Sequence, residues 1–172
     1  MRMKLPFLCV ILYFLLLLDM TGFSRDSTLI RFQLKDQFNQ LWTQNDFLGT
    51  TTIIVGSDRH GSEYNESWSF AIYDSLQRDG LADSVKFLAV ADTRGVPFFF
   101  RKMVRSHFPK EAHRWILLDW HGDFAQSYQF VPAECNLVLI DKKGKLVYHL
   151  SGKDLNNSKL KIFIQQIRLL FH

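Results

Sequence analysis

Residues 51–68 read Thr-Thr-Ile-Ile-Val-Gly-Ser-Asp-Arg-His-Gly-Ser-Glu-Tyr-Asn-Glu-Ser-Trp. The β-branched run at 51–55 predicts a buried strand, and the apolar positions from Tyr64 onward recur at helical spacing. A strand that passes through a short loop into a helix places that loop at the carboxyl edge of a sheet, where α/β proteins commonly bind ligands. The loop has neither a cysteine nor a glycine-rich phosphate-binding motif, and its polar side chains are Asp58, Arg59, His60, Ser62 and Glu63.

The start of the chain has the pattern of a secretory signal peptide. Arg2 and Lys4 are basic, and the fourteen residues 5–18 are apolar almost throughout. Such a run is shorter than the about 20 residues that a membrane-spanning helix needs. We therefore predict a signal peptide at residues 1–24 and one exported domain at residues 25–172, either periplasmic or secreted. The alternative is an uncleaved membrane anchor.

Composition limits the kinds of partner and of cross-link. The 172-residue chain carries a net charge of +4, which is mildly basic and does not predict nucleic-acid binding. Of the two cysteines, Cys9 lies within the apolar run, so Cys135 is the only thiol of the predicted domain. An exported domain with one thiol has no internal disulfide, so its hydrophobic core must stabilise it. We predict no cofactor.

The rest of the sequence alternates between strand and helix patterns. Residues 32–42 alternate around a polar turn, which predicts an N-terminal hairpin. Further strands are predicted at 86–92, 115–119, 137–141 and 146–150, the last two joined by a Lys-Lys-Gly turn. Helices are predicted at 63–78, 97–107 and 160–171. This order predicts one α/β domain with a largely parallel sheet, helices on both faces and a late antiparallel edge.

Two pairs of short motifs are informative through their order and spacing. The first pair is Phe32-x-Leu34-x-Asp36-Gln37 with Asp46-Phe47-x-Gly49; the second is Leu117-Leu118-Asp119-x-x-Gly122 with Leu139-Ile140-Asp141-x-x-Gly144. Together they resemble the thioredoxin-like superfamily, in particular its redoxin branch of peroxiredoxin-like and thiol-disulfide proteins. The second half is also similar to a cysteine-poor periplasmic subgroup, the YtfJ type. The resemblance covers residues 31–171 and implies a thioredoxin-like fold: a central mixed β-sheet flanked by helices, with an N-terminal β-hairpin.

The sequence departs from this family at the redox site. The resemblance places His60-Gly61-Ser62-Glu63 where thiol-disulfide members carry Cys-x-x-Cys. Those cysteines work because a helix N-terminus stabilises the attacking thiolate while the second thiol resolves the mixed disulfide. The family's cis-proline position falls at Glu134 or Cys135. The main prediction is therefore an exported protein without the dithiol site, which acts as a non-catalytic protein-binding or accessory protein of the envelope.

Two other functions are consistent with the same loops. If Cys135 faces the His60 loop, a protonated histidine would lower the thiol pKa, and a redoxin-type oxidoreductase or antioxidant activity could use Cys135, His60 and Glu63. Alternatively, His60, Glu63 and His121 could bind zinc or copper. Against these stand two structural interpretations. Asp58, Ser62 and Glu63 would only cap the helix, and Cys135 would be a small buried residue.

The segment 94–114 is rich in lysine and arginine, and its only acidic residue is Glu111. It predicts contact with an acidic surface or with anionic lipid headgroups, unless it is simply the solvated face of a helix. The expected partner is an envelope protein or peptide, and not nucleic acid. The predicted binding residues are Asp58, Arg59, Ser62, Trp120, Arg101, Lys102 and Arg105.

Overall fold

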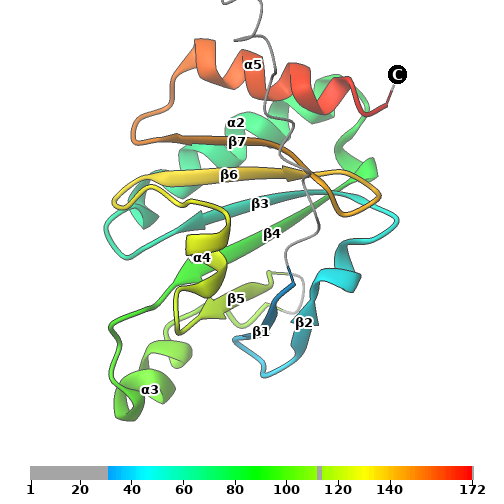
Figure 1. The fold of residues 1–172 in the computed structure, drawn as a ribbon. Coiled ribbons are helices and arrows are strands. Elements are labelled where there is room, and N and C mark those ends of the chain that lie inside the picture. Colours follow the sequence, from blue (N-terminus) through cyan, green and yellow to red (C-terminus); the bar gives the residue numbers. More distant parts are fainter. Residues whose placement is uncertain (1–30, 112–113, 172) are drawn as a thin grey trace, which may run out of the picture.

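A computed structural model describes residues 31–111 and 114–171, and the predicted signal peptide lies outside these ranges. The described part forms a seven-stranded sheet with the strand order β2-β1-β5-β4-β3-β6-β7 and helices packed against it (Figure 1). Within these residues no helix has both the length and the apolar character needed to cross a membrane.

Three parallel strands form the centre of the sheet. β3 (Thr51–Ser57) pairs with β4 (Val85–Asp92), and β4 pairs with β5 (Ile116–Asp119). Every residue of β3 is buried, as the β-branched run predicts for a strand covered on both faces. Because the three strands run in the same direction, their carboxyl ends meet at one edge of the sheet.

Antiparallel strands extend the sheet on both sides, so parallel pairing is confined to the centre. On one side β6 (Cys135–Ile140) pairs with β3, and β7 (Leu146–Gly152) pairs with β6. On the other side β1 (Gln33–Asp36) pairs with β5 and with β2 (Leu41–Thr43). The mixed sheet and the N-terminal hairpin are therefore confirmed. The prediction of a largely parallel sheet is wrong, because only the β3–β4 and β4–β5 pairs are parallel and the other four pairs are antiparallel.

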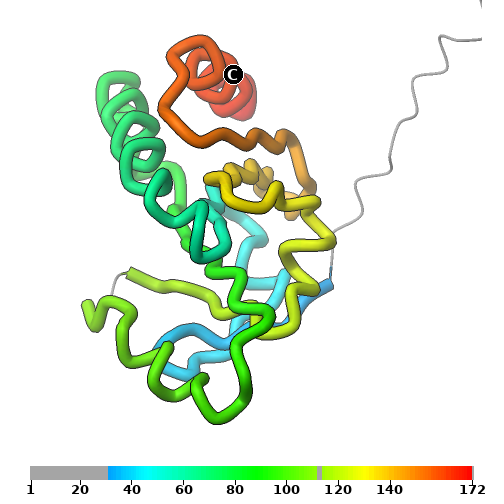
Figure 2. The backbone as a smooth tube through the Cα atoms, turned by 90° about the vertical axis from the view of Figure 1, so that its left-hand side faces the viewer, coloured from blue at the N-terminus to red at the C-terminus, as the bar shows by residue number. Residues whose placement is uncertain are grey.

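Helices cover both faces of the sheet, which separates the core into two clusters. α2 (Asn65–Arg78) and α5 (Asn157–Arg168) lie side by side on one face (Figure 2). The core beneath them includes Ile53, Trp68, Ile72, Leu137 and Phe163. On the opposite face α4 (Asp123–Ser127), which is too short for a periodic pattern, contributes Phe124 to a second cluster with Phe47, Ile54, Leu117 and Val138.

The predicted helix at 97–107 is built from two parts. The 3-10 turn η5 (Phe98–Phe100) follows Pro97 and leads directly into α3 (Arg101–Ser106). The sequence pattern therefore predicts the segment correctly, although only its second half is α-helical. Figure 1 shows α3 at the lower left, on the side of the sheet where β5, β1 and β2 lie.

Gly56 in β3 allows an aromatic ring to approach the strand. A Cβ atom at position 56 would lie 2.2 Å from the ring of Phe130, which is closer than carbon atoms can pack. Phe130 leads into the loop at 131–134, so this contact also helps to place that loop at the carboxyl edge of the sheet.

We expect Gly56→Ala to lower the free energy of unfolding by about 1–3 kcal/mol, because an added methyl group overpacks the core. The measurement is urea denaturation of wild type, of each single variant and of Gly56→Ala/Phe130→Leu. The double variant should recover part of the loss, because leucine vacates the space that the ring occupied. Equal stability of Gly56→Ala and wild type would contradict the contact.

Candidate functional site

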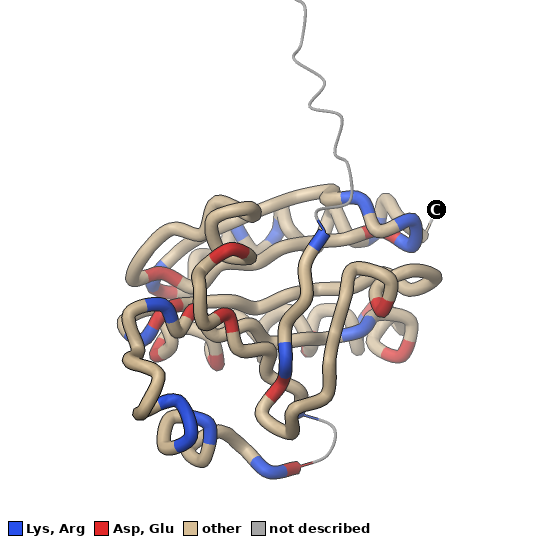
Figure 3. The backbone as a smooth tube through the Cα atoms, turned by 60° about the horizontal axis from the view of Figure 1, so that its bottom comes forward, with Lys and Arg blue, Asp and Glu red and all other residues tan. Residues whose placement is uncertain are grey.

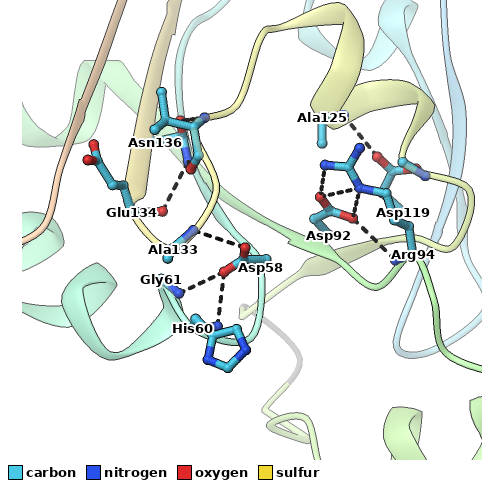
Figure 4. Close-up of polar contacts among 12 residues, drawn as sticks. Asp58, His60, Gly61, Asp92, Arg94, Asp119, Ala125, Ala133, Glu134 and Asn136 are labelled. Atoms are coloured by element: carbon cyan, nitrogen blue, oxygen red, sulfur yellow. Dashed lines mark hydrogen bonds and ion pairs between the residues drawn. The ribbon is translucent and has the colours of Figure 1, made fainter.

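Each of the three parallel strands ends at an aspartate. Asp58 follows β3, Asp92 is the last residue of β4 and Asp119 is the last residue of β5. Figure 4 shows that these carboxylates belong to two separate polar networks at the carboxyl edge. One network joins two loops around Asp58, and the other lies at the ends of β4 and β5.

Asp58 connects the loop after β3 with the loop before β6. Its Oδ1 accepts hydrogen bonds from the backbone N–H groups of His60, at 2.9 Å, and Gly61, at 2.8 Å. Its Oδ2 accepts a third bond, at 2.9 Å, from the backbone N–H of Ala133. One carboxylate thus holds together two segments that are far apart in the sequence (Figure 4).

The two loops also touch directly at Gly61. A Cβ atom there would lie 2.3 Å from the carbonyl oxygen of Glu134, so a larger residue does not fit without moving the backbone. Buried Asn136 holds the second loop from behind, since it accepts from the N–H of Val131 at 2.7 Å and donates to the carbonyl of Glu134 at 3.0 Å. The backbone of Glu134 therefore faces the loop at residues 58–63. None of the described peptide bonds is cis, including those at Glu134 and Cys135.

The hydrogen bonds of Asp58 change its acidity. Partial burial by itself would raise the pKa of Asp58, but the three backbone donors outweigh it, and the pKa lies below its ordinary value of 3.8. The group is therefore an ionised hydrogen-bond acceptor at neutral pH. It is not placed to supply a proton to a bound molecule.

The second network combines an ion pair with a capped helix. Arg94 Nε lies 2.9 Å from Asp92 Oδ2, and this hydrogen bond raises the pKa of the arginine. Asp119 accepts from the N–H groups of Gly122 and Ala125, each at 2.9 Å, at the start of α4. Burial raises the pKa of Asp119 even though these two donors oppose the shift. Arg94, predicted as part of a basic surface, is instead paired with Asp92.

The predicted residues of the first loop do not converge on a catalytic arrangement. The side chains of Arg59, His60 and Glu63 are exposed, and Ser62 Oγ donates to the carbonyl oxygen of Arg59 at 2.8 Å. Asp58 accepts hydrogen bonds from the backbone N–H groups of the turn before the helix. However, neither the 3-10 turn η3 (Ser62–Tyr64) nor α2 has a side-chain cap. The prediction that Ser62 and Glu63 cap the helix is therefore wrong.

The structure does not assemble the predicted metal ligands. Among the described residues, no group of three or more histidine, cysteine, aspartate or glutamate side chains is placed to hold a metal ion. His60 and Glu63 follow β3, whereas His121 follows β5 and lines a groove with Asp119 and Asp123. The proposed set of His60, Glu63 and His121 is thus not brought together.

Cys135 is a small buried residue, as the structural interpretation predicted, and its thiol is not exposed at the His60 loop. Its side chain is 1% exposed and lies in the core cluster with Trp68 and Leu137, beneath α2 and α5. Burial raises the pKa of the thiol to about 12. The neighbouring residue, Glu134, occupies the position opposite Gly61, which resolves the one-residue ambiguity of the sequence comparison.

The remaining predicted binding residues gather at a different place. They line a groove between α3 and the side of the sheet where β1, β2 and β5 lie, and they are Arg101, Lys102, Arg105 and Trp120. The guanidinium carbon of Arg101 lies 5.1 Å from the centre of the Trp120 ring, which is a cation–π arrangement. The sequence prediction thus identified two groups of residues that the fold places on separate surfaces.

Comparison with known proteins supplies the fold relationship. No protein-family model matches the chain, and no curated protein matches its sequence. Solved structures do match, beginning with the pneumococcal exposed lipoprotein thioredoxin of Streptococcus pneumoniae, at a TM-score of 0.57 and 16% identity over 80% of this chain and 99% of that one. The fold is thioredoxin-like.

Two further structures support this relationship. The thioredoxin domain of a thiol-disulfide oxidoreductase from Bacteroides vulgatus has a TM-score of 0.52 and 14% identity, over 81% of this chain and 94% of that one. A SCO1/SenC family lipoprotein from Bacillus anthracis has a TM-score of 0.55 and 12% identity, over 86% and 97% of the two chains. At these identities the likeness concerns the fold.

Sequence reasoning missed several residues that shape the edge. Asp92 enters the sequence analysis only as the last residue of a predicted strand, and neither Asn136 nor Ala133 enters it at all. Asp92 had a usable signal, because consecutive strands that each end in aspartate place carboxylates at one edge. Ala133 had none, since it contributes through its backbone N–H and a positive φ of 58°.

We expect Asp58→Asn to lower the free energy of unfolding by about 1–3 kcal/mol, because an amide cannot accept all three backbone bonds. Asp154→Asn is the matched control, since Asp154 is exposed, and it should change stability by less than about 0.5 kcal/mol. Denaturant titrations of wild type and both variants measure the difference. Similar losses in the two variants would show that Asp58 does not hold the loops.

The pH dependence provides a second measurement of the same group. A folded-state pKa below 3.8 means that Asp58 stabilises the fold fully above that value and loses this contribution as the pH falls through the folded-state pKa. The stability difference between wild type and Asp58→Asn should therefore be constant near neutrality and narrow below about pH 4. A difference that widens in acid would contradict the assignment.

Proposed function

We propose that this chain is an exported thioredoxin-like protein that binds a protein or peptide partner and carries out no thiol chemistry. The supporting observation is the state of the loop at residues 58–63. In the family resemblance this loop carries the two cysteines, whereas here Asp58 uses its carboxylate to join it to the loop before β6. Export is supported by the pattern of residues 1–24.

The chemistry of Cys135 supports a thiol-independent role. Thiol-disulfide exchange needs an accessible thiolate, because the thiolate is the nucleophile. Burial raises the pKa of the Cys135 thiol to about 12, so the thiol is protonated at pH 7. The same burial that raises the pKa also shields the sulfur from a second protein. Both requirements of the reaction are therefore unmet at this residue.

The carboxyl edge retains properties that suit binding. Its two loops are held together by hydrogen bonds from backbone N–H groups to the Asp58 carboxylate, so a partner meets a surface that is ordered before contact. Arg59, His60 and Glu63 project from this surface with exposed side chains. A pre-ordered edge with exposed polar side chains favours recognition of a partner, and it needs no cofactor to act.

The first test is thiol-dependent turnover by wild type and by Cys135→Ser, with peroxide and with the disulfides of insulin as substrates. We expect neither protein to exceed the rate of buffer with the thiol donor. Turnover by wild type that disappears in Cys135→Ser would overturn the proposal and indicate a one-cysteine oxidoreductase.

Alkylation tests the buried thiol directly. Native Cys135 should react with iodoacetamide at neutral pH far more slowly than free cysteine, and it should react at the rate of free cysteine in urea. His60→Cys is the control, because this position is exposed and its single added thiol should alkylate quickly in the native protein. Rapid labelling of native Cys135 would contradict the structure.

Capture from an envelope extract tests the binding edge. We expect a protein retained by the wild-type chain to be lost with Arg59→Ala/His60→Ala and kept with Glu66→Ala/Ser67→Ala, which alters exposed residues further along the chain on α2. Retention by both double variants would place the contact elsewhere on the molecule.

A further inference from the structure

A groove of about 890 Å³ lies on the side of the sheet formed by the N-terminal hairpin, apart from the Asp58 loops. Leu34, Leu41 and Leu118 line it, together with residues of η5 and α3. We call it the basic groove, because Lys35, Arg101, Lys102 and Arg105 also line it, while no acidic residue does.

The cations of this groove are not neutralised by ion pairs within the described part of the chain. The ion pairs among the described residues join Arg94 to Asp92 and Arg168 to Asp79, and none involves Arg101, Lys102 or Arg105. Figure 3 shows lysine and arginine gathered along α3, a helix with no aspartate or glutamate. A positive concave surface of this kind attracts and orients a negatively charged partner.

The arginines of the groove are ordered and incompletely satisfied. Arg101 is held over the Trp120 ring, and Arg105 donates to the side-chain carbonyl of Asn39. The buried Nε atom of each arginine has no hydrogen-bond partner. These guanidinium groups have therefore lost part of their hydration without gaining a charged acceptor, and a carboxylate beside them would recover part of that cost.

Large apolar side chains lie exposed beside the same charges. Phe98 is 83% exposed and Phe99 is 74% exposed, and Met103 on α3 is 52% exposed. Phe98 and Phe99 both line the groove, and the Phe99 and Phe100 rings lie 4.6 Å apart. Aromatic, methionine and arginine side chains gathered in one exposed patch are typical of protein–protein contact surfaces.

We infer that the basic groove binds an acidic segment of a partner protein that also carries apolar side chains. Its carboxylates would pair with Arg101 and Lys102, and its apolar side chains would cover Phe98 and Phe99. The inference deepens the proposed function, on which it rests, by giving the partner a chemistry and a second contact surface beyond the Asp58 loops.

Other occupants fit the charge or the shape less well. The chain's own residues 1–30 contain three basic and two acidic side chains, so they do not complement a positive groove. An anionic bilayer matches the charge, but it presents a broad surface, whereas the arginines are partly buried in a concavity. A protein segment can bring single carboxylates to fixed guanidinium groups, with the planar pairing that arginine favours.

The test is fluorescence anisotropy with the purified full-length chain and a labelled 14-residue peptide of glutamate with leucine at every third or fourth position. We expect saturable binding that weakens strongly as salt is raised. Peptides with lysine in place of glutamate, or with serine in place of leucine, should bind at least tenfold more weakly. The first replacement removes the charge complementarity and the second removes the apolar contact.

Variants with matched controls locate the site. Arg101→Gln/Lys102→Gln and Phe98→Ala/Phe99→Ala should each raise the dissociation constant at least tenfold. Lys153→Gln/Lys161→Gln and Phe70→Ala/Leu169→Ala remove the same kinds of exposed side chain elsewhere and should leave it unchanged. Circular dichroism and thermal melting identify any variant that has lost its fold; Lys102→Gln alone, at an exposed position, then gives the decisive comparison.

Three results would overturn the inference: no saturable binding of the acidic peptide, binding that all variants retain, or binding to phosphatidylglycerol vesicles without binding to the peptide. Self-association that sedimentation detects and that Arg101→Gln/Lys102→Gln abolishes would also overturn it. The occupant of the groove would then be a second copy of this chain. Failure of the peptide-binding test does not change the result of the turnover assay, which concerns Cys135. The inference about the groove and the proposed function can therefore fail separately.

Discussion

The carboxylate of Asp58 is the interaction on which the carboxyl edge of this molecule depends. It accepts three backbone hydrogen bonds and so joins the loop that follows β3 to the loop that precedes β6. Without it, those N–H groups would need water or another acceptor, and the close approach of Gly61 to Glu134 would lose its support. A dithiol site would place two sulfurs in the loop at residues 60–63, whereas here the carboxylate of Asp58 organises this edge.

Strand geometry explains why the thiol of Cys135 is buried. Side chains on β6 alternate between the two faces, so Cys135, Leu137 and Leu139 enter the core below α2 and α5. The register, with Gly56 opposite Asn136, turns the backbone of Glu134 toward Gly61. Both faces of β6 are covered, since all six of its residues are buried, so the thiol lies inside the core.

The same sheet separates two surfaces that the linear sequence does not distinguish. The Asp58 loops lie at the end of β3, whereas the basic groove is formed where the N-terminal hairpin packs beside β5 and α3. Arg94 is neutralised by Asp92, whereas in the described part of the chain Arg101 and Arg105 form no ion pair. Both surfaces have ordered polar groups, but only the groove combines them with exposed aromatic rings.

Local patterns in the sequence determined where the strands and the three longer helical segments lie along the chain. The buried run of β3 and the hairpin around Asp36 are local features, so period and turn chemistry reveal them. The absence of sulfur at residues 60–63 is likewise visible without a structure. Tertiary structure alone decided that β1 pairs with β5, that Ala133 binds Asp58, that Cys135 is buried and that His121 is apart from His60. These outcomes depend on pairing between distant segments, on register and on backbone donors, which side-chain identity does not encode locally.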